Sequence, residues 1–398
     1  MISFETALLK VLEFTEDYGS ELVELQSSQG RTLAETIIAD RDFPPFDRST
    51  KDGIAIKYNS DIGSDTSFKI AGIAQAGSPQ LTLEDESTCI EIMTGAMVPK
   101  NADAVVMYEH TRKENDGFSI TEPIKKGQNI HYKGSDTAME DKLLLRGTTI
   151  TSAEIGVLAT VGKFEVLVKK LPKVAVISTG NELVDVGQQP LPYQIRKSNS
   201  HTLIALLQSE HLEANMYHLV DEPIVLKKKL DELLNRYDVL LLSGGVSKGK
   251  FDFLPSTFDA LGVDKVFHKV MQRPGKPFWF GKHQSQKTII FSFPGNPVST
   301  FVNYHTYFLP WLNKTLGVPT SQFTVFLKEP MENKTDLTLF IGVEIGLDDG
   351  KLMARKISST GSGDLLSLSK AGGFVKLNPR ESLGANKLIS FIPARRIL

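Results

Sequence analysis

Four carboxylates fall in or beside polar turns of the sequence, where they could bind a hard metal ion. They are Asp52, Glu182, Asp221 and Asp252. Carboxylate oxygens suit Mg²⁺, which usually keeps several waters and substrate oxygens in its coordination shell. Taken singly, each acid is better explained as a surface or helix-capping residue, and Asp221, just ahead of Pro223, is the clearest capping candidate. The metal interpretation therefore depends on which other groups gather around these acids.

Three loops rich in glycine and hydroxyl groups are candidates to gather there. Each follows a short apolar run, and they read Ser-Thr-Gly-Asn-Glu at 178–182, Ser-Gly-Gly-Val-Ser at 243–247 and Pro-Gly-Asn-Pro-Val-Ser at 294–299. Small side chains with N–H and O–H donors suit a phosphorylated ligand. The candidate ligand-binding residues are Ser178, Thr179, Gly180, Ser243, Gly244, Gly245, Ser247, Pro294, Gly295, Asn296, Pro297 and Ser299.

The third loop also predicts the start of a helix. Asn296 suits the N-cap position and Pro297 the first helical position, and the spacing of Phe301, Tyr304 and Phe308 continues a helical pattern. Such a start would direct free N–H groups and the positive end of the helix dipole towards an anion. On its own, the segment is explained as well by a plain strand-to-helix turn.

The second loop comes close to the phosphate-binding loop of nucleotide hydrolases. Residues 244–250 have the glycine and lysine spacing of that motif, but Phe251 stands where Ser or Thr should bind magnesium. Pro255 also comes too soon for the long helix that follows a true phosphate-binding loop. The pattern therefore favours a glycine-rich anion-binding turn, with Asp252 beside it as a candidate metal ligand or base.

Three basic residues lie around a rigid turn in the same part of the chain. They are Lys269, Arg273 and Lys276, and the turn reads Arg-Pro-Gly-Lys-Pro at 273–277. Proline and glycine fix such a turn, and fixed cations neutralise the charge of a phosphate or an oxyanion. A solvated basic turn is the alternative interpretation.

Parallel strands are the elements that must position these loops. Apolar runs at 174–177, 239–242 and 288–291 alternate with amphipathic segments, which is typical of βαβ units. In such sheets the ligand lies beyond the carboxyl ends of the strands, where the loops meet. The sequence therefore predicts one α/β unit with a ligand site at that edge.

The rest of the chain predicts helical and β parts. Apolar residues recur at helical spacing from Phe4, and Leu33, Ile37 and Ile38 suggest a second short helix. A helical pattern resumes at 153–158. Short strands are predicted at 54–56, 68–71, 90–93 and 104–107, and again at 323–327, 337–341 and 388–392.

We therefore expect an α/β multidomain protein with four parts. A discontinuous N-terminal domain comprises residues 1–42 and 141–172, and a β domain at 43–140 is inserted into it. The α/β domain spans 173–318, and a C-terminal β domain spans 319–398. A length of 398 residues allows roughly two to four domains.

Composition narrows the class of protein. Hydrophobic residues make up 41% and charged residues 23%, as in globular proteins, and the net charge of −2 argues against nucleic acid or an anionic membrane as a partner. The single Cys89 supports neither a disulfide framework nor a cysteine metal site. No signal-peptide pattern is present, and no apolar run approaches the ~20 residues that span a bilayer. We expect a cytoplasmic protein.

Six motifs occur in the order found in one enzyme family. Residues 42–55 (Asp-Phe-Pro-Pro-Phe-Asp-Arg-Ser, then Asp-Gly-Ile-Ala) and 93–106 (Met-Thr-Gly-Ala, Val-Pro, Ala-Asp-Ala-Val-Val) resemble the two N-terminal signatures of the molybdopterin molybdenumtransferases, the family of MoeA and the gephyrin E domain. The loops at 178–183, 243–247, 274–277 and 294–297 resemble the remaining four. The resemblance extends from about Phe4 to Ile392.

This resemblance implies a fold, a reaction and a set of partners. The fold would be an elongated four-domain subunit with a MogA-like doubly wound α/β domain, a helical N-terminal segment, an inserted β domain and a C-terminal β domain. The enzyme would insert molybdate into adenylylated molybdopterin and release AMP with Mg²⁺. It would act as a homodimer, with its cleft between the α/β domain of one subunit and the N-terminal part of the other, and a molybdopterin adenylyltransferase would be its partner.

The resemblance also transfers functional positions, residue by residue. They are Asp52, Thr94, Glu182, Asp221, Asp252, Lys269, Arg273, Lys276, Pro294 and Pro297, with Glu182, Asp221 and Asp252 as the metal ligands. The chain departs from the family pattern at Lys51, where methionine is usual, and at Arg273, where lysine is usual. The C-terminal domain departs most, because 337–345 lacks an arginine-bearing strand and the turn at 360–364 is one residue short.

Two alternatives from other functional classes remain. A scaffold protein could keep this fold without turnover, as the gephyrin branch does. A molybdopterin-binding adenylyltransferase would use a related α/β domain. The Asp52 and Thr94 signatures, which lie outside the α/β unit, favour the molybdenum-inserting member.

Overall fold

The computed structural model describes residues 1–246, 253–319 and 321–395, and the chain divides into two compact units. The first unit comprises Met1–Ala34, Gly147–Ser152 and Glu165–Leu398, and the second comprises Glu35–Arg146 and Ala153–Phe164. The chain thus leaves the first unit and returns to it twice. No helix among the described residues is long and apolar enough to cross a membrane.

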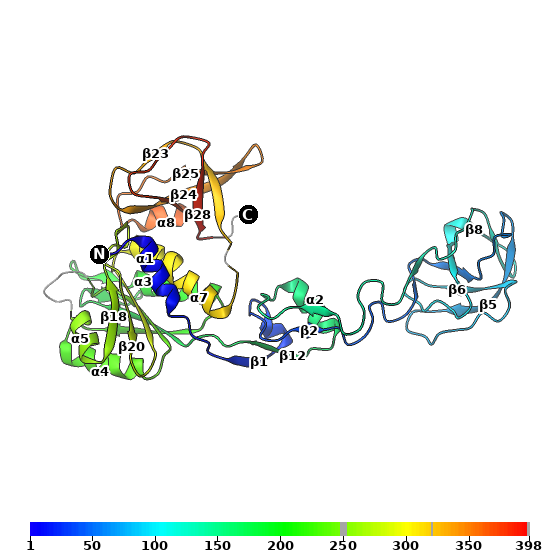
Figure 1. The fold of residues 1–398 in the computed structure, drawn as a ribbon, viewed down its shortest axis with the longest axis horizontal. Helices are drawn as coiled ribbons and strands as arrows, with labels where there is room; N and C mark the ends of the chain where they lie inside the picture. The colour runs from blue at the N-terminus through cyan, green and yellow to red at the C-terminus, as the bar shows by residue number, and fades with distance from the viewer. Residues whose placement is uncertain (247–252, 320, 396–398) are drawn as a thin grey trace. The chain divides into compact units, whose positions relative to one another are not determined.

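A six-stranded sheet forms the centre of the α/β part of the first unit (Figure 1). Its order is β16 (Ala214–Leu219), β13 (Val174–Thr179), β17 (Val239–Ser243), β21 (Ile289–Phe293), β20 (Trp279–His283) and β18 (Val263–His268). The first four strands are parallel, and β20 is antiparallel to both of its neighbours, β21 and β18. The three predicted strands are confirmed, and they lie side by side with continuous buried runs, as expected of a sheet covered on both faces.

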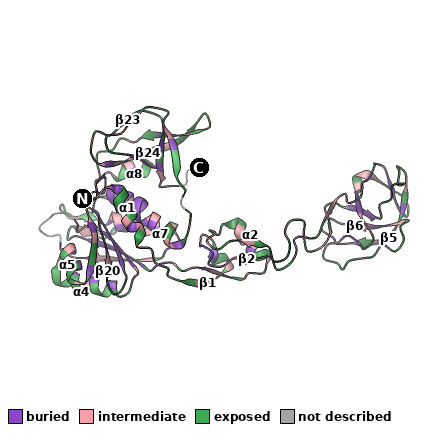
Figure 2. Cartoon of the chain, in the orientation of Figure 1, coloured by how far each residue is buried: buried purple, intermediate pink, exposed green. Residues whose placement is uncertain are grey.

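Helices cover both faces of this sheet because its side chains alternate between two cores. Val174, Val176 and Leu241 belong to a cluster that contains residues of α1 (Phe4–Glu13), α3 (Ser198–Ser209), α6 (Pro297–Asn303) and α7 (Leu309–Leu316). The alternate residues face α4 (Pro223–Leu234) and α5 (Leu254–Ala260). The α/β part is therefore doubly wound, as predicted. Figure 2 shows buried strands in this sheet and exposed outer surfaces on α4 and α5.

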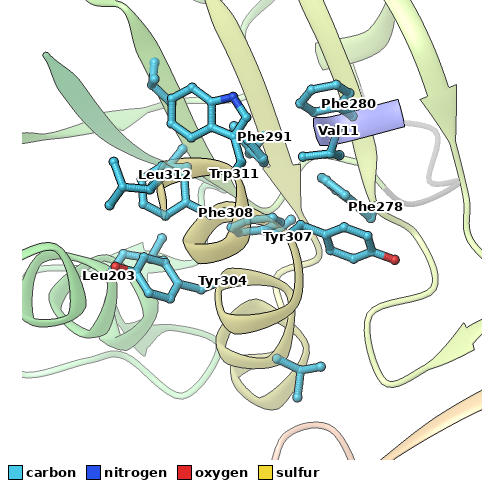
Figure 3. Packing of buried hydrophobic residues seen from close by; sticks show 14 of the residues in the cluster. Val11, Leu203, Phe278, Phe280, Phe291, Tyr304, Tyr307, Phe308, Trp311 and Leu312 are labelled. Carbon is cyan, nitrogen blue, oxygen red and sulfur yellow. The ribbon is translucent and has the colours of Figure 1, made fainter. Parts of the chain in front are cut away.

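The first of these cores is strongly aromatic. Between α6 and α7 the helix widens into a π-helical turn at Tyr304–Phe308. Figure 3 shows Phe308 and Trp311 of this helical segment packed beside Phe291 of the sheet, and Tyr304 beside Leu203 of α3. The rings of Trp311 and Phe291 meet edge to face with centroids 5.5 Å apart. Such contacts hold the helix after the third loop firmly against the strand that precedes it.

The C-terminal part of the first unit is a second six-stranded sheet. It is built from β19 (Gln272–Arg273), β24 (Thr338–Asp348), β25 (Lys351–Lys356), β22 (Phe323–Leu327), β28 (Leu388–Pro393) and β26 (Gly373–Leu377). The predicted C-terminal β structure is confirmed. The short strand β19 comes from the α/β part of the chain and pairs in parallel with the start of β24. Helix α8 (Leu365–Lys370) and the pair β23 (Met331–Glu332) and β27 (Ser382–Leu383) complete this part.

Four other elements of the first unit precede the α/β part in the chain. Helix α1 is confirmed at Phe4–Glu13, where the Ser3 side chain accepts a hydrogen bond from the Thr6 N–H and so caps the helix. Strand β1 (Ser20–Glu24) pairs antiparallel with β12 (Glu165–Lys169). A 3₁₀ turn at Leu25–Ser28 follows β1.

The second unit contains the inserted β structure. Its six-stranded sheet has the order β7 (Ala104–Met107), β4 (Gly53–Ile56), β6 (Thr88–Ile92), β5 (Ser67–Ala74), β9 (Gly117–Ile120) and β8 (Thr111–Lys113). A 3₁₀ turn occupies Tyr108–His110, and β3 (Arg48–Ser49) pairs with β10 (Ile130–His131). Helix α2 (Ser152–Thr160) confirms the helical pattern predicted at 153–158. The boundaries of the four-domain division stay a prediction.

The predicted second short helix near residues 33–38 is wrong. Leu33 makes an isolated bridge to Val168, and Ile37–Ile38 forms strand β2, which pairs antiparallel with β11 (Lys142–Leu144). Three apolar residues are too few to define a helical period. The β-branched isoleucines favour the extended conformation, which here gains a backbone partner more than 100 residues away.

Candidate functional site

The carboxyl ends of β13, β17 and β21 open into a cavity of about 330 Å³, which we call the small cavity. It lies where a parallel sheet is expected to bind its ligand. Its lining comprises Ser178, Thr179, Gly180, Glu182, Leu183, Ile195, Arg196, Lys197, Ser198, Asn199, Ser200, Asp221, Ser243, Gly244, Gly245, Gly295 and Pro297. The three loops that the sequence singled out therefore meet in one place.

Hydroxyl groups at the strand ends differ in how they are bonded. Ser178 Oγ lies 3.1 Å from His218 Nδ1, and Ser243 Oγ accepts a 2.8 Å hydrogen bond from the Asn199 side chain. By contrast, Thr179 Oγ1 and Ser200 Oγ are buried and have no hydrogen-bond partner among the described residues. Burial and the nearby Lys197 lower the pKa of His218, so this side chain is uncharged at neutral pH.

The Gly244–Gly245 pair keeps the second loop close to the first. Both residues have positive φ, +104° and +69°, where glycine is strongly favoured. A Cβ atom on Gly244 would lie 2.9 Å from the Thr179 carbonyl oxygen, and one on Gly245 would lie 2.5 Å from Leu254 Cδ1 and 2.8 Å from Thr179 Oγ1. Side chains at these two positions would therefore crowd the lining of the small cavity.

Two of the predicted acids, Glu182 and Asp221, line the small cavity. The Asp221 N–H donates to the Asn181 side chain at 3.1 Å, and Glu182 is exposed. Within the described residues no group of three or more His, Cys, Asp or Glu side chains is placed to hold a metal ion. Two carboxylates leave most of a metal coordination shell to waters and substrate oxygens. The predicted residues Ser247 and Asp252 lie outside the described residues.

The start of α3 contributes residues to the lining of the small cavity that were not predicted from the sequence. The small strands β14 (Leu183–Val184) and β15 (Ile195–Arg196) pair in parallel and lead the chain to this helix. Asn199 donates to Ser243 Oγ at 2.8 Å and to the Gly295 carbonyl at 2.7 Å, so it connects two of the loops. Polar residues at 198–200 ahead of the buried Leu203 and Leu207 are a helix-start signal that could have located this segment.

A larger cavity of about 590 Å³ lies between the α/β part and the C-terminal sheet, and we call it the large cavity. Its polar lining comprises Gln272, Arg273, Lys276, Asn296, Ser299, Lys356, Ser359, Ser362 and Ser367. Its apolar lining includes Val298, Leu337, Leu339, Phe340, Ile341, Ile357, Leu368, Ala371 and Phe374. Lys356, Ser359 and Ser362 were not among the predicted residues, and they belong to the C-terminal domain, which departs most from the family pattern.

The structure divides the predicted anion-binding residues between the two cavities. Arg273, Lys276, Asn296 and Ser299 line the large cavity, whereas Gly295 and Pro297 line the small one. The described linings of both cavities lack Lys269 and Pro294. The start of α6 therefore separates two cavities, whereas the sequence predicted a single ligand site.

The predicted helix start, with Asn296 at the N-cap and Pro297 at the first helical position, is confirmed, although the Asn296 side chain does not cap the helix. The Thr300 N–H instead bonds to the Asn296 carbonyl at 3.0 Å, and Thr300 Oγ1 donates to the Pro294 carbonyl at 2.7 Å. A buried threonine within the helix thus secures the turn that a capping side chain was expected to hold.

In the second unit the two N-terminal signatures form one cluster of loops. The Gly95 N–H donates to the Ser49 carbonyl at 2.8 Å, and the Ser49 N–H donates to the Ala96 carbonyl at 3.0 Å. Thr94 donates to Asp52 Oδ1 through its N–H at 2.6 Å and through Oγ1 at 2.8 Å. These bonds, the backbone one first, lower the pKa of the exposed Asp52 and keep it ionised.

Known proteins resemble the chain over nearly all of its length. Residues 2–162 match the family described as MoeA N-terminal region (domain I and II), and residues 175–314 match the probable molybdopterin binding domain. A Synechocystis protein named molybdopterin molybdenumtransferase is 36% identical over 381 residues, which cover 95% of each chain. A Staphylococcus epidermidis protein of the same name is 31% identical and covers 94% of this chain and 91% of its own.

A solved structure agrees with these relatives. The molybdopterin biosynthesis MoeA protein from Pyrococcus horikosii is 30% identical and covers 99% of each chain, with a TM-score of 0.83. Agreement over whole chains means that the N-terminal, α/β and C-terminal parts all have counterparts in that structure.

Proposed function

Because the chain belongs to the molybdopterin molybdenumtransferase family, we propose that it inserts molybdate into adenylylated molybdopterin and releases AMP. This is the last step of molybdenum cofactor synthesis. The small cavity is the observation that carries the proposal, because hydroxyl groups, glycine N–H groups and two carboxylates converge there at the carboxyl edge of the sheet. That set of groups suits a phosphorylated organic substrate.

Glu182 and Asp221 fit a role in holding Mg²⁺ together with substrate. This ion is commonly bound through one or two carboxylates plus substrate phosphates, and the small cavity offers two carboxylates beside phosphate-binding groups. When bound, Mg²⁺ would neutralise phosphate charge as AMP leaves. Asp252 is the proposed third ligand from sequence.

The molybdate oxyanion is proposed to bind on the large-cavity side of α6. Arg273 and Lys276 supply two positive charges there, and Ser299 and Ser362 supply hydroxyl groups. Arg273 offers a planar fork of donors, whereas Lys276 offers a compact point charge. Molybdate in the large cavity and the organic substrate in the small cavity would then lie on opposite sides of the α6 start.

Assembly and location are part of the same proposal. Asp52 and Thr94 belong to the second unit, and we propose that they complete the site of a partner copy in a homodimer. A molybdopterin adenylyltransferase would supply the adenylylated substrate. The single, buried Cys89 supports a reducing cytoplasmic setting.

The decisive experiment is an assay of the purified protein with adenylylated molybdopterin, molybdate and Mg²⁺. AMP release and molybdenum incorporation are followed together, and each component is omitted in turn. We expect both products to appear in equal amounts and only in the complete mixture. Formation of adenylylated molybdopterin from molybdopterin and ATP would identify an adenylyltransferase instead. Absence of both reactions would identify a non-catalytic scaffold.

A further inference from the structure

We infer that the small cavity holds a phosphate group of its ligand at the start of α3, with Lys197 as the cation and the Ser200 and Thr179 hydroxyls as donors. This deepens the proposed function and depends on it for the identity of the phosphorylated substrate. It also assigns the phosphate to residues outside the basic turn at 273–277.

Lys197 is a buried cation with one carboxylate partner within the described residues. Its side chain is 9% exposed, and its ammonium forms an ion pair with Asp185, whose side chain is 68% exposed. A lysine ammonium has three donors, and this is its single ion pair within the described part of the chain. Burying a charge is unfavourable unless it is paired and hydrogen-bonded. Lys197 lines the small cavity, so an anion there would accept hydrogen bonds from ammonium donors that Asp185 does not use.

Two buried hydroxyls without partners point to the same ligand. Ser200 is 1% exposed and Thr179 is 4% exposed, and both line the small cavity. Neither side-chain oxygen has a hydrogen-bond partner among the described residues. Buried polar groups are normally satisfied, so an unsatisfied pair at one cavity indicates a group that binds there. Phosphate oxygens accept hydrogen bonds from hydroxyl groups.

The backbone at the start of α3 adds further donors. This helix has 12 residues, and its N-cap residue Lys197 makes no side-chain capping hydrogen bond. The first N–H groups of an α-helix have no partner within the helix, and the positive end of the dipole lies there. Ser198, Asn199 and Ser200 all line the small cavity, so this helix start faces the ligand.

Other charged groups at the cavity do not replace Lys197. Arg196 also lines it, but this side chain is exposed, and its Nε donates to the Gln188 carbonyl at 3.1 Å. His218 is held uncharged, and Arg273 and Lys276 line the large cavity instead. The acids Glu182 and Asp221 oppose a bare phosphate, and bound Mg²⁺ would offset them.

Calorimetric titration of the full-length protein with AMP and with adenosine, at fixed Mg²⁺, tests this inference. We expect the wild-type protein to bind AMP more tightly than adenosine. Lys197→Met should weaken AMP binding about ten- to hundredfold and leave adenosine binding unchanged, because a charged hydrogen bond is lost. Lys169→Met is the matched control and should leave AMP binding unchanged, because Lys169 is also a largely buried lysine paired with an exposed aspartate, Asp17, and lies outside the linings of both cavities.

Ser200→Ala separates a ligand-binding role from a structural one. Its hydroxyl has no internal partner, so the melting temperature of the free protein should stay the same or rise. Affinity for AMP should fall about three- to tenfold, since one hydrogen bond to the ligand is lost. A lower melting temperature with unchanged AMP affinity would make the hydroxyl structural and overturn its assignment.

Asp185→Asn tests whether Lys197 binds the phosphate directly or acts only through its ion pair, by shaping the loop that precedes α3. If Lys197 binds the phosphate directly, AMP affinity should be unchanged or tighter when its carboxylate partner is removed. A loss as large as that of Lys197→Met would show that the ion pair only shapes the loop. Absence of AMP binding to the wild-type protein would also overturn the inference. None of these measurements requires molybdenum insertion, so a failed insertion assay would refute the proposed function and leave the phosphate site standing.

Discussion

Thr94 donates two hydrogen bonds to one carboxylate oxygen of Asp52, from its backbone N–H and from its side-chain hydroxyl. The two residues are 42 positions apart and come from separate sequence signatures. Because the N–H bond fixes the loop and the hydroxyl completes the pair, the charge and the direction of the carboxylate are set together. Asp52 is thus presented to solvent as a fixed anion.

The first prediction concerns the ionisation of Asp52. Its pKa is lowered from an ordinary value of 3.8, so its bonds to Thr94 stabilise the fold fully above that value. The stabilisation should be lost as the pH falls through the lower, folded-state pKa. Thr94→Val removes the hydroxyl bond and keeps the N–H bond, so the pKa should move part of the way back to 3.8. Carboxyl carbon NMR titration would measure this, and an unchanged pKa would contradict the assigned cause.

The second prediction concerns Glu182 and the metal. Glu182→Gln keeps the size of the exposed side chain and removes its charge, so the melting temperature should be unchanged. Molybdenum insertion should fall roughly hundredfold or more, because a group that supports Mg²⁺ is lost. Glu222→Gln is the control, since that residue is also exposed and lies outside the small-cavity lining. Near-normal turnover of Glu182→Gln at limiting Mg²⁺ would refute the metal role.

The third prediction concerns the glycine pair of the second loop. Gly245→Ala places a side chain at positive φ, 2.5 Å from Leu254 Cδ1 and 2.8 Å from Thr179 Oγ1, so both strain and crowding arise. Gly262→Ala is matched for backbone strain, because its φ is +76° and no heavy atom lies within 4 Å of the added carbon. The control should lose about 1–2 kcal/mol of unfolding free energy, and Gly245→Ala should lose more. Urea denaturation would measure both, and equal losses would rule out crowding at the cavity.

The fourth prediction concerns assembly. A homodimer should be present at micromolar concentration, and sedimentation would measure it. Mixing Asp52→Asn protein with Lys276→Ala protein should then restore part of the activity, because one site of a mixed dimer receives both intact residues. Verified subunit exchange without any recovered activity would argue against a site shared between copies.

The strands of the α/β part could be predicted because strands buried on both faces appear in the sequence as continuous apolar runs. Val174–Thr179 and Val239–Ser243 are buried along their whole length, and such runs bounded by glycine-rich loops have few other interpretations. The helix predicted around Ile37–Ile38 was wrong because this segment forms a strand that depends on pairing with Lys142–Leu144. A pairing so distant in the chain leaves no local signal.

The residue types that line the site could be predicted from the sequence. Which of the two cavities each residue lines could not. Glycine, hydroxyl and acidic residues identify ligand-binding loops by their chemistry. Sequence spacing does not tell on which side of a helix start a basic residue will point, and Arg273 and Lys276 therefore could not be assigned to a cavity. Lys197 carried no signal of its own, because burial of a single lysine depends on the packing of the surrounding loop.

The short strand β19 links the stability of the C-terminal sheet to the presence of the α/β part. Gln272 and Arg273 pair with Thr338 and Leu339, so residues from one part cover the exposed edge at the start of β24 in the other. Gln272 is fully buried and bonds through Nε2 to Asn303 of α6 at 2.9 Å. A C-terminal domain released by proteolysis would therefore carry an open sheet edge, available to other chains. In the intact chain, the Gln272–Arg273 pairing keeps that edge covered.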